Sequence, residues 1–330
     1  MNNSSFNHKT VAYAAGPGDV IGTFVHWQSG QVDPSEVAET YSGQFFQSTS
    51  HLGFSGFVIA SHKRCDSVSA GQFVVEHFPK SAWGRSGLSY HLADIYYWLH
   101  TIRRIIQSNS AVAIISDMNH WWLLSILKLG GIKVVPTLHR TFWPKGFRPR
   151  GPKERLIHAL NGWFWRHIPA ATICISPECQ RQAETIAEKG LAGMVLQARP
   201  KYLPGYFTAF TPPVWRNQPF QLLFAGRIET NKGVFDLVSV IQKLTVDHGL
   251  KVYLEVCGDG GAFEALVERV RQLELEPIIK LHGKLSQAAM LAAFQRCHVV
   301  VVPTTAEFAE GLNKVVVEGV LAGRPVIASS

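Results

Sequence analysis

The hydrophobic pattern of residues 1–200 alternates between short apolar runs and segments whose apolar positions recur at helical spacing. The runs are rich in β-branched residues and apolar on both faces, which is typical of strands in a parallel sheet covered on both sides. They lie at 9–15, 56–61, 111–117, 132–139 and 171–176. This part of the chain is therefore predicted to form one α/β domain.

A helix near the start of this domain carries its own start signal. Asp33 suits the N-cap, Pro34 suits the first helical position, and Glu36 stands three residues after the cap. This spacing is that of a capping box. A helix is therefore predicted to begin at Asp33.

The same alternation returns after a proline-rich stretch. Residues 199–219 hold five prolines and no clear periodicity, so 201–219 is predicted to be an interdomain linker. Further apolar runs follow at 220–226, 251–258, 278–283, 298–304 and 325–330. The predicted fold class is α/β, with two Rossmann-like parallel-sheet domains, 1–200 and 220–330, that face a cleft. Ligands of such sheets bind beyond the carboxyl ends of the strands.

The composition is typical of a globular protein and limits its expected cellular location. Of 330 residues, 46% are hydrophobic and 17% are charged, which is enough for two cores. The best candidate for a membrane span, 121–138, is interrupted by lysines and glycines, so no span is expected. Five cysteines without a CxxC pair indicate reduced thiols, and the polar residues 1–10 show no secretory signal, so a cytoplasmic location is expected. The net charge of +8 favours anionic partners without choosing among them.

Two basic residues follow the first strand of the second domain. This strand ends at Gly226, and Arg227 and Lys232 stand before Gly233 and an apolar helix. Arginine can donate two parallel N–H bonds to a phosphate and lysine adds a compact charge, so the pair suits a diphosphate. The residues alone also allow a solvated loop with two ordinary basic side chains.

The closing stretch, 307–330, places two glutamates around the start of a helix. Glu310 and Glu318 stand eight positions apart. At the rise of a helix, that separation is at most about 12 Å. Residues 311–313 lead into a helix predicted to end near Ala322, and the free backbone N–H groups at its start can receive an anion. Glu318 could instead be an ordinary charge on the helix surface.

Together these segments resemble the family-4 (group 1) retaining glycosyltransferases, which have the GT-B fold. The resemblance is carried by GRIETNKG, VCGDG, LHGKLS and VVVPTTAEFAEGLNKVVVEGVLAGRPVIAS, and it covers 220–329. Upstream, VVPTLHRTFWP and ATICIS match mainly in strand order. The resemblance implies that the first domain binds an acceptor and that the second binds a nucleotide-sugar donor.

The resemblance also implies roles for individual residues. Arg227 and Lys232 would bind the donor diphosphate and stabilise the leaving group. Glu310 would lie beside the donor sugar, and His139 would reach that sugar from the first domain; these four are the implied catalytic residues. The ribose would be bound by Glu318. The other residues implied to contact the donor are Gly226, Gly258, Asp259, Gly311, Leu312 and Asn313. No metal and no cofactor is expected besides the nucleotide sugar itself.

The assignment of His139 has a rival. The chain has fourteen histidines, and His120 also lies at the end of a predicted strand. A single histidine more often has a structural role than a catalytic one, so the choice rests on the match to the family.

Two features depart from the family pattern. Gly16 and Gly18 follow the first strand, where the family often has a glycine loop near donor and acceptor, so they are candidate binding residues with an imperfect pattern. Family members also continue beyond PVIAS, whereas this sequence ends at Ser330. We therefore expect the second domain to be shortened, with a poorly covered sheet edge and apolar surface near 325–330.

Residues 140–168 mix basic and aromatic side chains. Arginines and lysines surround Trp143 and Phe147, and a helix with an apolar face follows. This combination suits contact with an acidic membrane, so the acceptor could be lipid-linked and the protein could lie at the inner face of the membrane. The alternative is a mobile acceptor loop followed by an ordinary core helix.

The leading hypothesis is a metal-independent, retaining glycosyltransferase that moves a sugar from a nucleotide-diphosphate donor to a glycan or glycolipid acceptor in polysaccharide or glycoconjugate biosynthesis. The alternative is a catalytically weakened or inactive nucleotide-sugar-binding protein. Nucleic-acid binding is disfavoured because no recognition motif accompanies the basic charge. A dinucleotide dehydrogenase is disfavoured because no GxGxxG follows the first strand.

Overall fold

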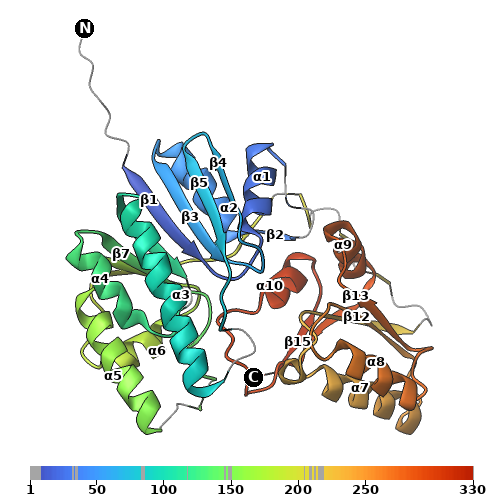
Figure 1. The fold of residues 1–330 in the computed structure, drawn as a ribbon. Coiled ribbons are helices and arrows are strands. Elements are labelled where there is room, and N and C mark those ends of the chain that lie inside the picture. The colour runs from blue at the N-terminus through green and yellow to red at the C-terminus, as the bar shows by residue number, and fades with distance from the viewer. Residues whose placement is uncertain are drawn as a thin grey trace. The chain divides into compact units, whose positions relative to one another are not determined.

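The chain forms two compact units. The computed structural model describes residues 9–31, 33, 36–82, 86–116, 118–144, 146–147, 151–203, 205–207, 210–211, 213–214 and 219–329. Unit 1 comprises Met1–Asp33, Thr40–Phe142 and Pro149–Arg199, and unit 2 comprises Pro34–Glu39, Trp143–Arg148 and Pro200–Ser330. Each unit is a sheet with helices around it (Figure 1). The domain boundaries given by the sequence stay a prediction.

Unit 1 is built on an eight-stranded sheet in the order β4-β5-β3-β1-β6-β7-β8-β9. Its neighbouring strands are parallel except for the antiparallel pair β4 and β5. The strands are β1 (Thr10–Ala15), β3 (Ser55–Ser61), β4 (Ser67–Ala70), β5 (Phe73–Phe78), β6 (Ser110–Ser116), β7 (Lys133–Leu138), β8 (Ala171–Cys174) and β9 (Met194–Gln197). Residues on both faces of β3 are buried, so the sheet is covered on both sides. The predicted parallel α/β architecture is confirmed.

The helices of unit 1 bury aromatic side chains against this sheet. They are α1 (Val20–Gln28), α2 (Tyr41–His51), α3 (Gly87–Gln107), η1 (Trp121–Leu124), α4 (Ser125–Leu129), α5 (Pro152–His167) and α6 (Pro177–Ala187). Phe24 and Phe46 pack with Phe73 of β5 in one cluster, while Trp121 packs on Trp165 in another. Within the described residues, no helix is both long enough and apolar enough to cross a bilayer.

The helix predicted to begin at Asp33 is not formed where the structure describes the chain. Pro34 lies outside the described residues, Glu36 lies outside any helix, and β2 (Ala38–Glu39) follows directly. β2 pairs antiparallel with β10 (Lys201–Tyr202). The prediction was wrong because a long-range strand pairing overrides a local capping signal.

Unit 2 has a five-stranded parallel sheet in the order β13-β12-β11-β14-β15. The strands are β11 (Phe220–Ala225), β12 (Val252–Cys257), β13 (Ile279–Gly283), β14 (Val299–Val302) and β15 (Val326–Ala328). The helical elements are η2 (Thr230–Lys232), α7 (Val234–Gln242), η3 (Lys243–Asp247), α8 (Phe263–Gln272), α9 (Gln287–Arg296) and α10 (Lys314–Leu321). Most of the buried strand positions are Val or Leu, as expected for a sheet covered on both faces. Ile327 on β15 and Val320 and Leu321 on α10 are exposed, so apolar side chains face solvent near this edge.

Candidate active site

Two neighbouring strands of unit 2 are each followed by a glycine, and the backbones of the two glycines touch. Gly226 follows β11 and Gly258 follows β12. Gly258 has a φ of +149°, and a Cβ added to it would lie 1.8 Å from the carbonyl oxygen of Gly226, so no other residue fits. The adjoining loops are also hydrogen-bonded, because Ile228 N donates to Asp259 O at 3.0 Å. These contacts hold the loops together at the carboxyl ends of the strands.

The turn after β11 is locked to the loop after β14. Gly233 has a φ of +71°, and an added Cβ would lie 1.8 Å from the carbonyl oxygen of Pro303. The backbone N–H and the hydroxyl of Thr305 both donate to Asn231 O at 3.0 Å. The segments GRIETNKG and PTTAEF, far apart in sequence, therefore meet.

Lys232 and Glu310 form an ion pair at this meeting point. The Nζ of Lys232 donates to Glu310 Oε1 at 2.6 Å, and Asn313 Nδ2 donates to Glu310 Oε2 at 3.0 Å. Lys232 is only 8% exposed, and its Nζ lies 3.8 Å from the ring centroid of Phe308. A lysine this buried needs an opposite charge, and the face of an aromatic ring favours a cation as well. The structure thus fixes the predicted residues Lys232, Glu310 and Asn313 in one cluster.

Arg227 lies over the same aromatic ring but remains accessible. Its Cζ is 5.7 Å from the ring centroid of Phe308, and its NH1 donates to Glu229 Oε1 at 2.8 Å. Its side chain is 65% exposed, and exposed ion pairs of this kind contribute little to stability. Arg227 can therefore exchange Glu229 for a more highly charged anion with little loss of stability.

The start of α10 offers backbone donors beside this cluster. Asn313 caps the helix, since its Oδ1 accepts from Val315 N at 3.1 Å. The backbone N–H groups of residues 311–313 have no hydrogen-bond partner among the described residues. The start of α1 differs, because the carboxylate of Asp19 already accepts from Gly22 N at 2.8 Å. Of these two helix starts, that of α10 is the one suited to an incoming anion.

Glu318 lies in the second turn of α10 and is buried. The hydroxyl of Tyr202 donates to its Oε1 at 3.4 Å. Burial raises the pKa of the Glu318 carboxyl above its usual value, while Lys314 and Tyr202 oppose this rise. Glu318 is therefore not an ordinary exposed helix charge, which was the alternative left open by the sequence.

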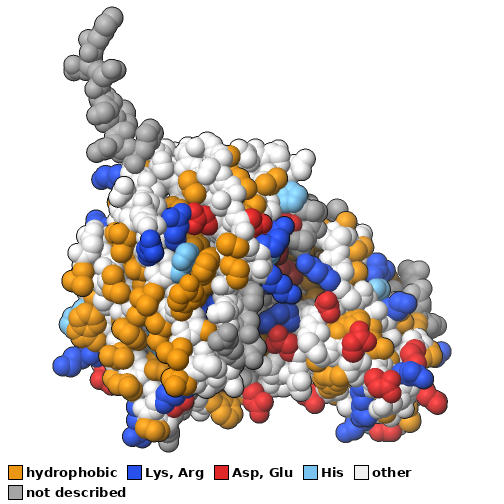
Figure 2. Space-filling view, in the orientation of Figure 1, with side chains coloured by type: hydrophobic (Ala, Val, Ile, Leu, Met, Phe, Trp, Pro, Cys, Tyr) orange, Lys and Arg blue, Asp and Glu red, His pale blue; other side chains and the backbone are white. Residues whose placement is uncertain are grey.

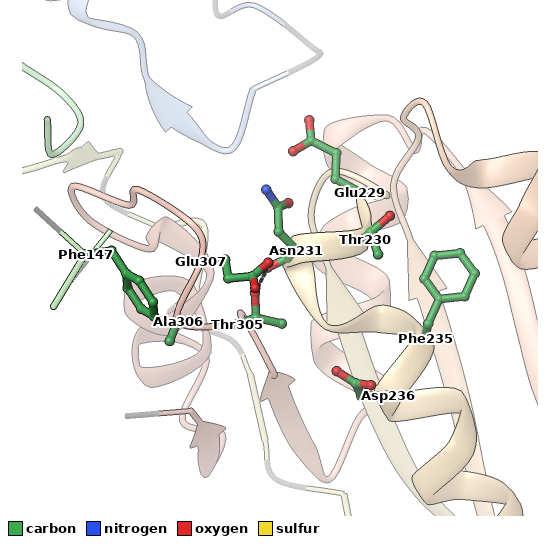
Figure 3. Close-up of a pocket in the computed structure, with 9 residues that line it drawn as sticks. All are labelled: Phe147, Glu229, Thr230, Asn231, Phe235, Asp236, Thr305, Ala306 and Glu307. Atoms are coloured by element: carbon green, nitrogen blue, oxygen red, sulfur yellow. Dashed lines mark hydrogen bonds between the residues drawn. The ribbon is translucent and has the colours of Figure 1, made fainter. Parts of the chain in front are cut away.

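A hollow of about 720 Å³ lies next to this cluster. It is lined by Phe147, Glu229, Thr230, Asn231, Phe235, Asp236, Thr305, Ala306 and Glu307. Figure 3 shows Asn231, Thr305 and Glu307 gathered between the 305–307 loop and the start of α7. The three carboxylates of this lining make the hollow unsuited to a phosphate group. The cationic residues Arg227 and Lys232 are not part of its lining.

The remaining predicted site residues lie in unit 1, at the carboxyl ends of its strands. Gly18 N donates to Ser61 O at 3.4 Å, and a Cβ added to Gly16 or Gly18 would meet no atom within 4 Å. Packing therefore does not require glycine at either position. His139 follows β7, and its Nε2 lies 3.0 Å from Thr137 Oγ1 and 3.4 Å from Ser116 Oγ.

The rival histidine, His120, is enclosed in a buried polar network. Its Nε2 lies 3.0 Å from His91 Nδ1 and 3.9 Å from Asp94 Oδ2, and Asp94 is fully buried. Burial lowers the pKa of His120. This setting fits a structural role for His120, whereas His139 is only partly buried.

Two residues of the site had not been expected from the sequence. Phe308 supplies the ring under both cations, and Tyr202 supplies the hydroxyl that meets Glu318. Phe308 stands two positions before Glu310, within the segment that carries the family resemblance. Its place in the sequence could therefore have marked it as a candidate site residue. Tyr202 lies at the start of the proline-rich stretch and gave none.

The fold is that of solved GT-B structures, which match nearly the whole chain. Sucrose-phosphate synthase from Thermosynechococcus elongatus superposes with a TM-score of 0.64 at 14% identity, over 98% of this chain and 81% of that one. Anabaena HepE in complex with UDP-glucose gives 0.61 at 14% identity, over 97% and 80%. The Escherichia coli trehalose-6-phosphate structure bound with UDP-2-fluoro glucose gives 0.67 at 10% identity, over 95% and 82%.

The last 123 residues of the chain resemble a known family. Residues 208–330 match the family of glycosyl transferases group 1. Glycogen synthase from Mycobacterium tuberculosis is 25% identical over 223 residues, which are 64% of this chain and 51% of that enzyme. The chain thus spans about half the length of the curated relatives that it matches. Residues 208–330 are thus similar to the group 1 glycosyl transferases.

Proposed function

We propose that this protein is a retaining glycosyltransferase that uses a nucleotide-diphosphate sugar and requires no metal ion. The observation that carries the proposal is the cluster of Lys232, Glu310 and Asn313 at the open start of α10, with Arg227 over the same aromatic ring. Two cations and a row of free N–H groups can together balance the charge of a diphosphate.

The donor would lie along the carboxyl ends of the unit 2 strands. Its diphosphate would contact Arg227, Lys232 and the N–H groups of 311–313. The nucleoside would lie near Gly226, Gly258 and Asp259, with Glu318 binding the ribose. A uridine diphosphate sugar is the favoured donor, because solved structures of similar fold hold UDP-glucose or its 2-fluoro analogue.

The proposed reaction proceeds on one face of the sugar. The bond between the anomeric carbon and the phosphate oxygen breaks, and its electron pair stays on the leaving diphosphate. The acceptor oxygen forms the new bond from the same face, and its proton passes to the departing phosphate oxygen. Lys232 and Arg227 would stabilise the charge on the leaving group, while Glu310 would support positive charge at the anomeric carbon. His139 of unit 1 would contact the donor sugar.

The acceptor in this proposal is a glycan or a lipid-linked glycan, in polysaccharide or glycoconjugate biosynthesis. Residues 140–168 would approach an acidic membrane, since Lys153 and Arg155 are exposed on α5. All five cysteines are free and four of them are buried, which fits a reducing compartment such as the cytoplasm.

A thermal-shift series with UDP-glucose and other nucleotide sugars tests this function. Donor at about a hundredfold excess over its Kd should stabilise the protein by about 2.7 kcal/mol. Arg227→Ala should greatly reduce that stabilisation, whereas the exposed Lys251→Ala, at the amino end of β12, should not. Transfer or hydrolysis of the bound donor would support an active enzyme. Binding without turnover would favour an inactive nucleotide-sugar-binding protein, and an unchanged shift in Arg227→Ala would contradict the phosphate site.

A further inference from the structure

Helix α3 presents an uncovered apolar stripe to solvent. Five large side chains are exposed along it at steps of three, four or seven residues, so they share one face of the helix: Leu88, Leu92, Tyr96, Leu99 and Ile106. Leu88 is 73% exposed, although the opposite side of α3 is buried against the sheet of unit 1. A core-facing helix needs only one apolar face. The exposed apolar face of α3 therefore indicates a binding surface.

Neighbouring helices extend this apolar surface. Ile126 and Leu129 are exposed on α4, and Leu129 is 89% exposed. On α5, Phe164 and Trp165 are buried in the core, while Leu156, Leu160 and Trp163 face solvent. A shallow apolar hollow of about 330 Å³ joins the two helices, lined by Trp122, Leu123, Ser125, Ile126, Leu129, Leu160 and Trp163.

The apolar side chains form one surface, here called the α3–α5 face and made of the exposed residues of α3, α4 and α5. Figure 2 shows hydrophobic side chains gathered over these three helices. A continuous apolar surface of this kind marks an interaction site in most proteins, whereas isolated exposed apolar residues do not.

The charges on the α3–α5 face have one sign. Its exposed charged residues are Arg103, Lys128, Lys153 and Arg155. Among the described residues of α3, α4 and α5, no aspartate or glutamate is exposed; Asp94 is buried and Glu154 is partly buried. A second copy of the chain docked symmetrically on this face would set cations against cations, which is unfavourable. An anionic partner is favoured instead.

We propose that the α3–α5 face docks on the surface of an anionic lipid bilayer. The leucine and isoleucine side chains would enter the boundary between headgroups and acyl chains, with the four cations among the lipid headgroups. Tyr96 and Trp163 have the amphipathic rings that favour this boundary. The inference rests on the proposed function only in giving that enzyme a membrane-bound acceptor.

Co-sedimentation with vesicles tests the apolar part of the face. The wild-type protein should bind phosphatidylcholine vesicles that contain phosphatidylglycerol, and its partition coefficient should fall at least about tenfold in Leu92→Glu/Leu160→Glu. A matched double variant, Val240→Glu/Val267→Glu, changes helix positions of similar exposure in unit 2 and should bind like the wild type. Equal loss in both double variants would overturn the proposal.

The charge requirement is tested with the same vesicles. Lys153→Gln/Arg155→Gln should lower the partition coefficient roughly tenfold or more, since each basic residue near an acidic surface contributes on the order of 1 kcal/mol. Lys251→Gln/Arg269→Gln removes two exposed cations from unit 2 and should have little effect. Binding of the wild type to pure phosphatidylcholine at the same level would overturn the anionic preference.

Binding of UDP-glucose, measured as a thermal shift, is a readout independent of vesicle binding. All four variants should keep the UDP-glucose-dependent thermal shift, because no substitution touches the phosphate cluster. A failure of vesicle binding with an intact shift would therefore reject the membrane face alone. Absence of the shift with intact vesicle binding would reject the donor site alone. A lipid-free dimer that dissociates in Leu92→Glu/Leu160→Glu would show that a second copy covers the face and would overturn the proposal.

Discussion

The ammonium group of Lys232 lies 2.6 Å from a carboxylate oxygen of Glu310, although 78 residues separate them in the sequence. The side chains of this pair are 11% and 24% exposed. Water therefore screens the two charges only weakly, so each depends on the other more than the partners of a surface ion pair would.

This dependence predicts strong coupling in a double-mutant cycle. Lys232→Met and Glu310→Gln should each lower the free energy of unfolding, and the double variant should lose less than the sum, with a coupling energy of about 1 to 3 kcal/mol. Chemical denaturation measures all three variants. The exposed pair Arg271 and Glu268, 3.9 Å apart, is the control and should couple by no more than about 1 kcal/mol. Additive losses at Lys232 and Glu310 would contradict the buried pair.

The burial of Glu318 predicts that its carboxylate lowers the stability of the protein at neutral pH, although the same carboxylate is proposed to bind the nucleotide. Because burial raises the pKa of its carboxyl, the folded state holds the proton more tightly than the unfolded state. Its contribution to stability is therefore complete below the ordinary value of 4.5 and is lost as the pH rises through the folded-state pKa. Glu318→Gln keeps an acceptor for Tyr202 and carries no charge, so it should be more stable than the wild type at neutral pH and should bind the nucleotide more weakly. Thermal melts across this pH range and a UDP titration check both effects; an unchanged UDP affinity would count against ribose binding.

His77 predicts a loss of stability toward acid pH. Its side chain is fully buried on β5, its Nδ1 lies 2.9 Å from Asp66 Oδ1, and its Nε2 accepts from Ile21 N at 3.3 Å. Burial lowers its pKa, although Asp66 and Asp19 oppose this effect.

Below the ordinary pKa of 6.5, the unfolded chain takes up a proton that the folded state resists. The free energy of unfolding should then fall with falling pH, by at most about 1.4 kcal/mol per pH unit from this one group. His77→Gln should flatten the slope, and the exposed His51→Gln should retain it. An identical slope in His77→Gln would contradict this role.

Substitution by alanine should affect stability strongly at Gly233 of unit 2 and weakly at Gly18 of unit 1. At Gly233 the added Cβ would lie 1.8 Å from the backbone oxygen of Pro303, at a positive φ, so Gly233→Ala should destabilise unit 2 by more than about 2 kcal/mol. Gly18→Ala meets no atom within 4 Å and should change stability by less than about 0.5 kcal/mol. Thermal melts compare the two. Loss of donor turnover in a stable Gly18→Ala protein would support the proposed binding role of that loop.

Much of the architecture could be predicted because buried parallel strands leave a clear signal. The apolar runs in both halves of the chain are strands of the two sheets. The hairpin of β4, an edge strand, and β5, its neighbour, was missed, since more and less buried positions alternate along both strands and neither forms a continuous apolar run. The helix at Asp33 was predicted wrongly because pairing with β10 lies outside any local pattern.

The candidate site was predictable where a short motif carries its chemistry. Arg227 and Lys232 stand in one stretch, and Glu310, Asn313 and Glu318 stand in another. The sequence could not show that the two stretches meet through an ion pair and share the ring of Phe308, because those contacts arise from the parallel order of β11 and β14.

The most direct test of the donor site compares the binding of UDP and uridine by calorimetry, in the wild type and in Lys232→Met. The wild type should bind UDP more tightly than uridine. Removing the ammonium should weaken UDP binding about 10- to 100-fold, as expected for one lost charged hydrogen bond, and leave uridine binding unchanged. Lys251→Met should match the wild type. If Lys232→Met binds UDP as tightly as the wild type does, the diphosphate does not lie at the start of α10.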